Sequence, residues 1–340
     1  MTKKKSRFTA LVVLFLLVLF SIFFASSVGA VPISITTTWK ILLSKLGFYA
    51  NSSFNQYEVL TIWELRLPRV ILSLLTGASL AICGALFQSI FRNPICDPYI
   101  LGISSGASLG AAIAFILGLN VFFFGVTIAA LISGLLTLFV IITIAQFGNK
   151  QSTYSLLLIG IAINFFLSAI ITLLIVINQE SMQKIIFWTM GSFGTTSWSD
   201  ILLLISIMIP VIFILYYHSK DLNILQLGSE TAKTLGVNTE KITILTLSAA
   251  SVLIATAVSI CGVIGFIGLI VPHIVRILVG NNIRTVFIFS LFVGAIFMLI
   301  ADTLARTIAI PSELPVGSIT AMAGAPYFIY LLIRRKKEFI

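Results

Sequence analysis

The chain contains unusually few charged residues. Only 9% of its 340 residues are Asp, Glu, Lys or Arg, whereas soluble domains carry about 25%. Hydrophobic residues make up 59% of the chain, and apolar stretches of about 20 residues, enough for one helical membrane crossing, recur along its length. The sequence therefore predicts an all-α polytopic membrane protein that forms a single domain over residues 1–340. The longest polar stretch, about 220–241, is too short to be a domain.

Residues that build metal and redox sites are scarce. The chain has three cysteines and two histidines, and it has no C-x-x-C spacing, so a usual zinc site is not expected. Cys83, Cys96 and Cys261 all fall within or beside apolar stretches, and we interpret them as small buried thiols. We predict no metal site and no resident cofactor.

Catalytic motifs are also missing. Without a Walker A sequence the chain should bind no nucleotide, and without an H-E-x-x-H, Ser/Lys or Asp/Asp set it should not be an intramembrane enzyme. Ionisable groups cost about 2.5–3.5 kcal/mol or more at the bilayer centre, yet carriers driven by ion gradients usually keep a few. Asp97, Asp302 and Glu313 are the acids nearest the spans and do not lie at mid-span, so we expect another subunit to supply the energy. A secondary carrier or channel remains the alternative.

Ten membrane spans are expected from the apolar stretches. The eighth is too short for a full crossing, and short segments interrupted by glycine or proline often line transport pathways. The spans are expected at about residues 9–29, 68–91, 99–117, 121–146, 153–177, 199–217, 242–264, 269–280, 285–307 and 315–333.

The basic residues set the expected orientation. With both termini inside, fifteen of the twenty-one Lys and Arg fall on the inner side, as the positive-inside rule requires. Lys150 and Lys233 should then face the cytoplasm and Lys184 the outside. Because the basic clusters at both chain ends flank spans, we assign the net charge of +10 to contact with anionic lipid and expect no nucleic-acid partner. The six outer residues would be Lys40, Lys45, Arg66, Arg69, Lys184 and Arg306.

Three arginines gather at the outer mouth. Arg66 and Arg69 are three residues apart, so on a helix they face nearly the same way, and Arg306 ends another span on that side. They predict a cationic rim that receives an acidic surface. The alternative is that they reach lipid headgroups or pair with Glu64 and Glu313.

A short helix is expected in the inner polar segment. Ser229 before Glu230 is a helix start, and Gly236 after Leu235 is a helix stop. Ala232 and Leu235 are three residues apart, which would place them on one helix face. We interpret the segment as a docking lever for a cytoplasmic protein, with a solvated loop as the alternative.

A family pattern is present in a set of short segments, at residues 65–69, 92–94, 97–98, 101–106, 188–191, 235–237, 262–276, 301–302, 313–315 and 324–326. Taken together, these segments resemble the permeases of bacterial ATP-binding-cassette (ABC) importers for iron siderophores, haem and cobalamin. The resemblance covers about residues 65–334. Two departures are Cys96, where the family often has alanine, and the run 281–284, which replaces a more usual Asp-His-Arg turn.

The resemblance implies a transport subunit rather than an enzyme. It implies a homodimer or a closely related heterodimer, two cytoplasmic ATPase subunits, an extracytoplasmic binding protein and a place in the bacterial cytoplasmic membrane. The implied cargo is an iron chelate such as a ferric siderophore, with haem or cobalamin as alternatives. Site residues implied by position are Arg66, Arg69 and Arg306 for binding-protein docking, Glu230, Ala232, Leu235 and Gly236 for ATPase coupling, and Ser152 and Thr153 for the inner gate.

Overall fold

The computed structural model describes residues 2–29, 31–48, 54–147 and 153–335. Within these ranges the regular structure is helical and no strand is assigned. Each of the ten expected spans corresponds to a helix. These helices are α1 (Thr2–Ser27), α4 (Leu67–Ile90), α5 (Ile103–Ile116), α6 (Gly125–Phe147), α7 (Thr153–Ile177), α9 (Trp198–Tyr217), α12 (Thr239–Cys261), α13 (Ile267–Val279), α14 (Ile283–Ala305) and α15 (Val316–Arg335).

Length and apolar composition support the membrane assignment. Seven helices in the described part of the chain are long and apolar enough to cross a bilayer, and α5 and α13 are shorter apolar helices. The third expected span starts later than predicted because Pro98–Leu101 forms a 3-10 turn, η2, before α5. The chain is thus an all-α polytopic membrane protein, as predicted.

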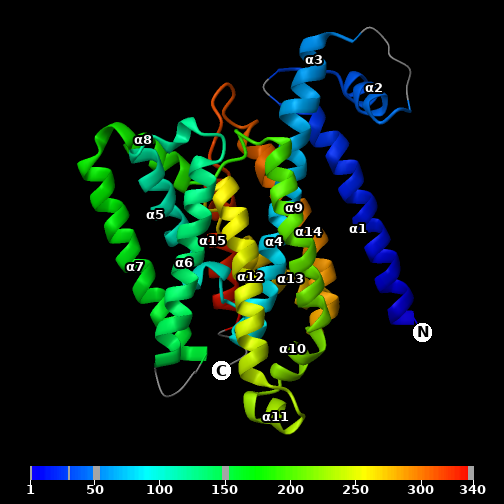
Figure 1. Ribbon diagram of the computed structural model, residues 1–340. Helices are drawn as coiled ribbons and strands as arrows, with labels where there is room; N and C mark the ends of the chain where they lie inside the picture. Colours follow the sequence, from blue (N-terminus) through cyan, green and yellow to red (C-terminus); the bar gives the residue numbers. More distant parts are fainter. Residues whose placement is uncertain (1, 30, 49–53, 148–152, 336–340) are drawn as a thin grey trace.

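Short helices cap both ends of the bundle (Figure 1). The upper end carries α2 (Ile35–Lys45), α3 (Gln56–Leu60) and α8 (Gln179–Thr189), and the lower end carries α10 (Ser219–Leu225) and α11 (Ser229–Thr234). A π-helical turn, η1 (Thr61–Arg66), joins α3 to α4. Because α1 begins at the lower end and α11 also lies there, the positive-inside rule assigns this end to the cytoplasm.

Helix α4 forms the centre of the bundle. Nearly all of its residues are buried, and it packs against α14, α13, α12 and α9. Glycines allow the closest approaches: a Cβ at Gly84 would lie 1.8 Å from the carbonyl oxygen of Gly268, and one at Gly77 would lie 2.3 Å from that of Gly294. Small residues at such crossings let membrane helices pack by van der Waals contact.

The shortness of the eighth span has a local cause. Gly262, at φ 73°, ends α12, and Phe266 has the left-handed φ of 71° immediately before α13 begins. The Tyr99 hydroxyl donates a hydrogen bond to the carbonyl oxygen of Ile264 at 3.0 Å. Protein groups thereby satisfy this non-helical backbone, as a segment at membrane depth requires.

Gly84→Val is expected to prevent stable folding. Its added atoms would meet the backbone of Gly268, which cannot move aside as a flexible side chain can, and overpacking typically costs about 1–3 kcal/mol and sometimes more. Thermal unfolding of the detergent-purified protein measures the effect. Gly265→Ala is the control, because a Cβ there meets nothing within 4 Å, and an unchanged melting temperature for Gly84→Val would contradict the packing described.

Candidate functional site

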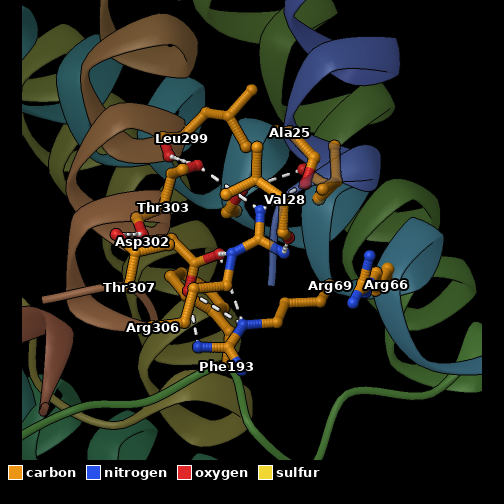
Figure 2. Close-up of polar contacts among 12 residues, drawn as sticks. Ala25, Val28, Arg66, Arg69, Phe193, Leu299, Asp302, Thr303, Arg306 and Thr307 are labelled. Atoms are coloured by element: carbon orange, nitrogen blue, oxygen red, sulfur yellow. Dashed lines mark hydrogen bonds and ion pairs between the residues drawn. The ribbon is translucent and has the colours of Figure 1, made fainter. Parts of the chain in front are cut away.

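Arg69 is held by two carboxylates at the upper end of the bundle. Its Nε lies 2.9 Å from Oδ1 of Asp302, and its Nη1 lies 2.8 Å from Oε2 of Glu313. Arg69 is 8% exposed and Asp302 is fully buried. A buried charge is tolerated only when it is paired and hydrogen-bonded, so this contact fixes α4 against α14 (Figure 2).

Arg306 connects the same carboxylate to the end of α1. It follows Asp302 by four residues, and its Nε lies 3.5 Å from Asp302 Oδ2. Its two Nη atoms donate to the carbonyl oxygens of Val28 at 2.9 Å and Ala25 at 2.7 Å, as Figure 2 shows. The last carbonyls of a helix lack hydrogen-bond donors within the helix, and the Arg306 guanidinium supplies such donors at the end of α1.

Arg66 completes the joint from η1. Its Nη1 donates to the carbonyl oxygens of Ser27 at 3.1 Å and Ser26 at 3.3 Å, and its Nη2 donates to that of Val31. Together the three arginines, Asp302 and Glu313 form a cluster, which we call the outer joint, that ties the end of α1 to α4 and α14.

The three arginines predicted to form a cationic rim are buried in the structure. Arg66, Arg69 and Arg306 are 7%, 8% and 4% exposed, because they are used to satisfy backbone carbonyls and carboxylates. The alternative of pairing with Glu313 holds for Arg69, whereas Glu64 forms no ion pair within the described ranges.

Asp302 is the partner that sequence reasoning missed. Its spacing of four residues from Arg306 on one predicted helix was the available signal. Three guanidiniums face two carboxylates in the outer joint, so one positive charge stays unbalanced.

A cavity of about 540 Å³ lies beside the outer joint. Glu313, whose side chain is 47% exposed, lines it together with Lys184 from α8 and Asp200 from α9. Hydroxyl groups add to its polar wall, including those of Ser192 and Ser197. The upper end therefore presents mixed charges around a hollow, with Glu313 connecting that hollow to the buried arginines.

The predicted helix at the lower end is present and ends at the predicted glycine. Helix α11 runs from Ser229 to Thr234, and Gly236 has φ 82°. The N–H of Gly236 donates to the carbonyl of Lys233 and that of Val237 to the carbonyl of Ala232, both at 3.0 Å. These two bonds are the Schellman pattern, in which glycine takes the left-handed position.

The predicted pair Ala232 and Leu235 differs in burial. Ala232 is completely buried against the bundle, whereas Leu235 is 58% exposed. The N–H of Leu235 still donates to the carbonyl of Thr231 at 3.1 Å, so the chain turns only after this residue, at Gly236. Leu227, on the other side of α11, is also exposed. Ala232 thus anchors the segment, and the two leucines remain as its free apolar groups. Glu230 lies 3.4 Å from Lys233 in an exposed ion pair, a kind of contact that contributes little to stability.

The remaining predicted positions are only partly described. Ser152 lies outside the described residues. Thr153 is the first residue of α7, and Figure 1 shows that end of α7 at the lower end of the bundle. All three cysteines are free and buried, as predicted. The described residues contain no group of three or more His, Cys, Asp or Glu able to hold a metal ion.

Labelling from outside should distinguish the two ends of the bundle. Lys184 belongs to α8 at the upper end and Lys233 to α11 at the lower end, while Lys150 lies outside the described residues. In a background without native cysteines, an impermeant thiol reagent applied to intact cells is expected to label Lys184→Cys but not Lys233→Cys or Lys150→Cys. Labelling at 233 before membranes are opened would contradict the orientation.

Comparison with known proteins identifies the family to which this helix bundle is similar. Residues 16–334 match the model of the FecCD transport family. The chain is 36% identical to the hemin transport system permease protein of Yersinia pestis, over 92% of each chain. It is 36% identical to the Fe(3+)-citrate import system permease protein of Bacillus subtilis, over 97% of this chain and 96% of the relative.

A solved structure shows the same fold. An inward-facing metal-chelate type ABC transporter superposes with a TM-score of 0.84 at 32% identity, covering 96% of this chain and 99% of that one. The matches extend over the whole helix bundle, including both ends described above. The chain therefore belongs to the FecCD transport family.

Proposed function

We propose that the chain is the membrane-spanning permease of an ABC importer and that it moves a ferric siderophore delivered by an extracytoplasmic binding protein. The observation that carries this proposal is α11 at the cytoplasmic end. Ala232 anchors it to the bundle, while Leu227 and Leu235 present apolar side chains to the cytoplasm. An anchored helix with exposed apolar ends suits a partner groove. Relatives of this chain are named as permease proteins of hemin and Fe(3+)-citrate transport systems, and the solved structure of the same fold is a metal-chelate type ABC transporter.

ATP hydrolysis would take place in two separate cytoplasmic subunits. Movement of those subunits would displace α10 and α11 and, through them, the lower ends of α9 and α12, to which the segment connects. Ser152 and Thr153 would act as an inner gate that closes the exit, and Thr153 begins α7 at this same end. The segment with Glu230, Ala232, Leu235 and Gly236 is thus the proposed coupling element.

A second permease subunit would cover the exposed side of α7. Only 6% of its apolar stretch is buried in the described chain, and Phe165 and Phe166 are largely exposed. The family membership favours a pathway between two copies of this chain, or between this chain and a close paralogue, in the bacterial cytoplasmic membrane.

The binding protein would dock at the upper end. The outer joint has one unbalanced positive charge just below the surface, and a charge there attracts an acidic surface through the intervening low-dielectric protein. Arg66, Arg69 and Arg306 would act in docking through this field, rather than as exposed side chains.

The cargo follows from the relatives' names, which include hemin and Fe(3+)-citrate. Haem or cobalamin import by the same machinery is the second candidate. A secondary carrier is less well supported, because the buried charges of the outer joint already pair with one another and offer no free site for a coupling ion.

Reconstitution tests the proposal. The permease, its ATPase subunit and its binding protein are placed in liposomes, and uptake of a ⁵⁵Fe-labelled ferric siderophore is measured with ATP inside. Uptake should require ATP and the binding protein, and haem or cobalamin should compete poorly. Uptake that continues on an ion gradient without ATP would establish a carrier, and preferential uptake of haem or cobalamin would replace the proposed cargo.

A further inference from the structure

A polar cavity of about 460 Å³ opens at the lower end beside the coupling segment. It lies between the end of α4, the α10–α11 connection and α13. Two cations, Arg92 and Arg276, contribute to its wall, and most of the other lining residues are polar. The other lining residues are Gln88, Ser89, Pro94, Gln226, His273, Ile277 and Asn281.

Arg276 is oriented by neutral groups. One Nη donates to Gln88 Oε1 at 2.6 Å, and the other donates to the carbonyl oxygen of Ala85 and to Ser89 Oγ, both at 2.9 Å. The Nε2 of Gln226 donates a hydrogen bond to the same Ser89 hydroxyl at 3.2 Å. These contacts fix the guanidinium in place but leave its charge unbalanced.

Arg92 adds a second unbalanced charge. It is exposed and sits in the left-handed region at φ 48°, which non-glycine residues seldom adopt. Its Nη1 lies 3.8 Å from the point that a Cβ on Gly228 would occupy, so it reaches the coupling segment. The ion pairs found in the described residues include neither Arg92 nor Arg276.

We propose that this cavity receives a carboxylate side chain of the cytoplasmic ATPase subunit, as a second contact beside α11. The inference rests on the proposed function, because it needs an ATPase docked on the coupling segment. Gln226 and Gly228 lie in the connection between α10 and α11, directly before the coupling element, so a protein seated on α11 would cover the opening of the cavity. Two guanidiniums without an acid are the complement of a carboxylate, which Arg recognises through paired N–H donors.

The experiment measures affinity between the purified permease in nanodiscs and its ATPase subunit. Arg92→Glu is expected to raise the Kd at least about tenfold, because reversing one partner of an interface charge pair adds repulsion. It should also flatten the dependence of Kd on salt. Arg92→Asn removes the charge with a residue that tolerates the left-handed conformation and should show a smaller loss in the same direction. Lys184→Glu makes the same charge change at an exposed position of α8, at the opposite end of the bundle from the ATPase, and should alter the Kd less than about threefold.

A charge exchange identifies the partner atom. Acid-to-arginine changes on the permease-facing surface of the ATPase should include one that restores binding to Arg92→Glu and weakens binding to the wild type. The inference would be overturned if both Arg92 variants bound the ATPase subunit with wild-type affinity and salt dependence. It would also be overturned if the variants kept that affinity but lost a co-purifying phospholipid, because the cavity would then bind lipid. Failure of the wild-type permease to bind any ATPase subunit would contradict the proposed function itself.

Discussion

Arg69→Glu is expected to abolish stable folding of the chain in the membrane. The substitution would place a third carboxylate beside Asp302, which is fully buried and lies 2.9 Å from the present guanidinium. Removing one partner of a buried ion pair typically costs about 3–5 kcal/mol, because the other charge is left uncompensated. That amount is comparable with the whole stability of many proteins.

Solubilised yield and thermal unfolding in detergent measure this effect. Lys184→Glu is the matched control, because it reverses a charge at the same end of the bundle in a cavity wall and not in the outer joint. Combining Arg69→Glu with Asp302→Arg should recover part of the lost stability, since the pair is then restored in reverse. Normal yield and melting temperature for Arg69→Glu alone would show that the outer joint does not hold the bundle together.

The outer joint also changes how binding-protein docking has to be tested. Reversing Arg66 and Arg69 together would confound loss of docking with loss of the fold. Glu313 is the better position, because its side chain is 47% exposed and it connects the outer cavity to Arg69. Its removal alters the surface charge while Arg69 keeps Asp302 as a partner.

The spans were predictable because a bilayer demands long apolar helices whatever their neighbours. Among the short capping helices α11 was predicted from its start and stop signals, but the others were not, because their composition is mixed. Helix α2, for example, has only three buried residues, and neither its length nor its polarity separates it from a loop. Its one readable signal was Ser34, whose side chain accepts a hydrogen bond from the N–H of Thr37 as an N-cap.

The site illustrates the same division between local and tertiary information. The end of α11 at Gly236 was predictable, because a Schellman turn depends only on neighbouring residues. The pairing of Arg69 with Asp302 joins residues 233 positions apart, and it exists only once α4 and α14 pack together. The partners of Arg66 are backbone carbonyls that no side-chain pattern records. Charge placement could therefore locate the arginines at the outer end but could not establish whether they face solvent.

Gly236→Trp is expected to leave the permease folded and to abolish ATP-driven import. The isolated chain has room for a side chain here, since a Cβ at Gly236 meets nothing within 4 Å. The left-handed backbone, at φ 82°, costs a non-glycine residue about 1–2 kcal/mol, which a bundle of this size should tolerate. The indole would project beside Leu235, on the surface proposed to enter the ATPase groove.

Gly236→Ala separates backbone strain from obstruction. It imposes a similar conformational penalty but adds only a methyl group, so it should retain most of the import activity while Gly236→Trp retains almost none. Thermal unfolding should differ little between the two variants, whereas binding of the ATPase subunit should be lost only with tryptophan. Equal import by Gly236→Trp and the wild type would show that α11 and its terminal turn are a solvated loop, and equal loss in both variants would assign the effect to the turn conformation and not to an occupied groove.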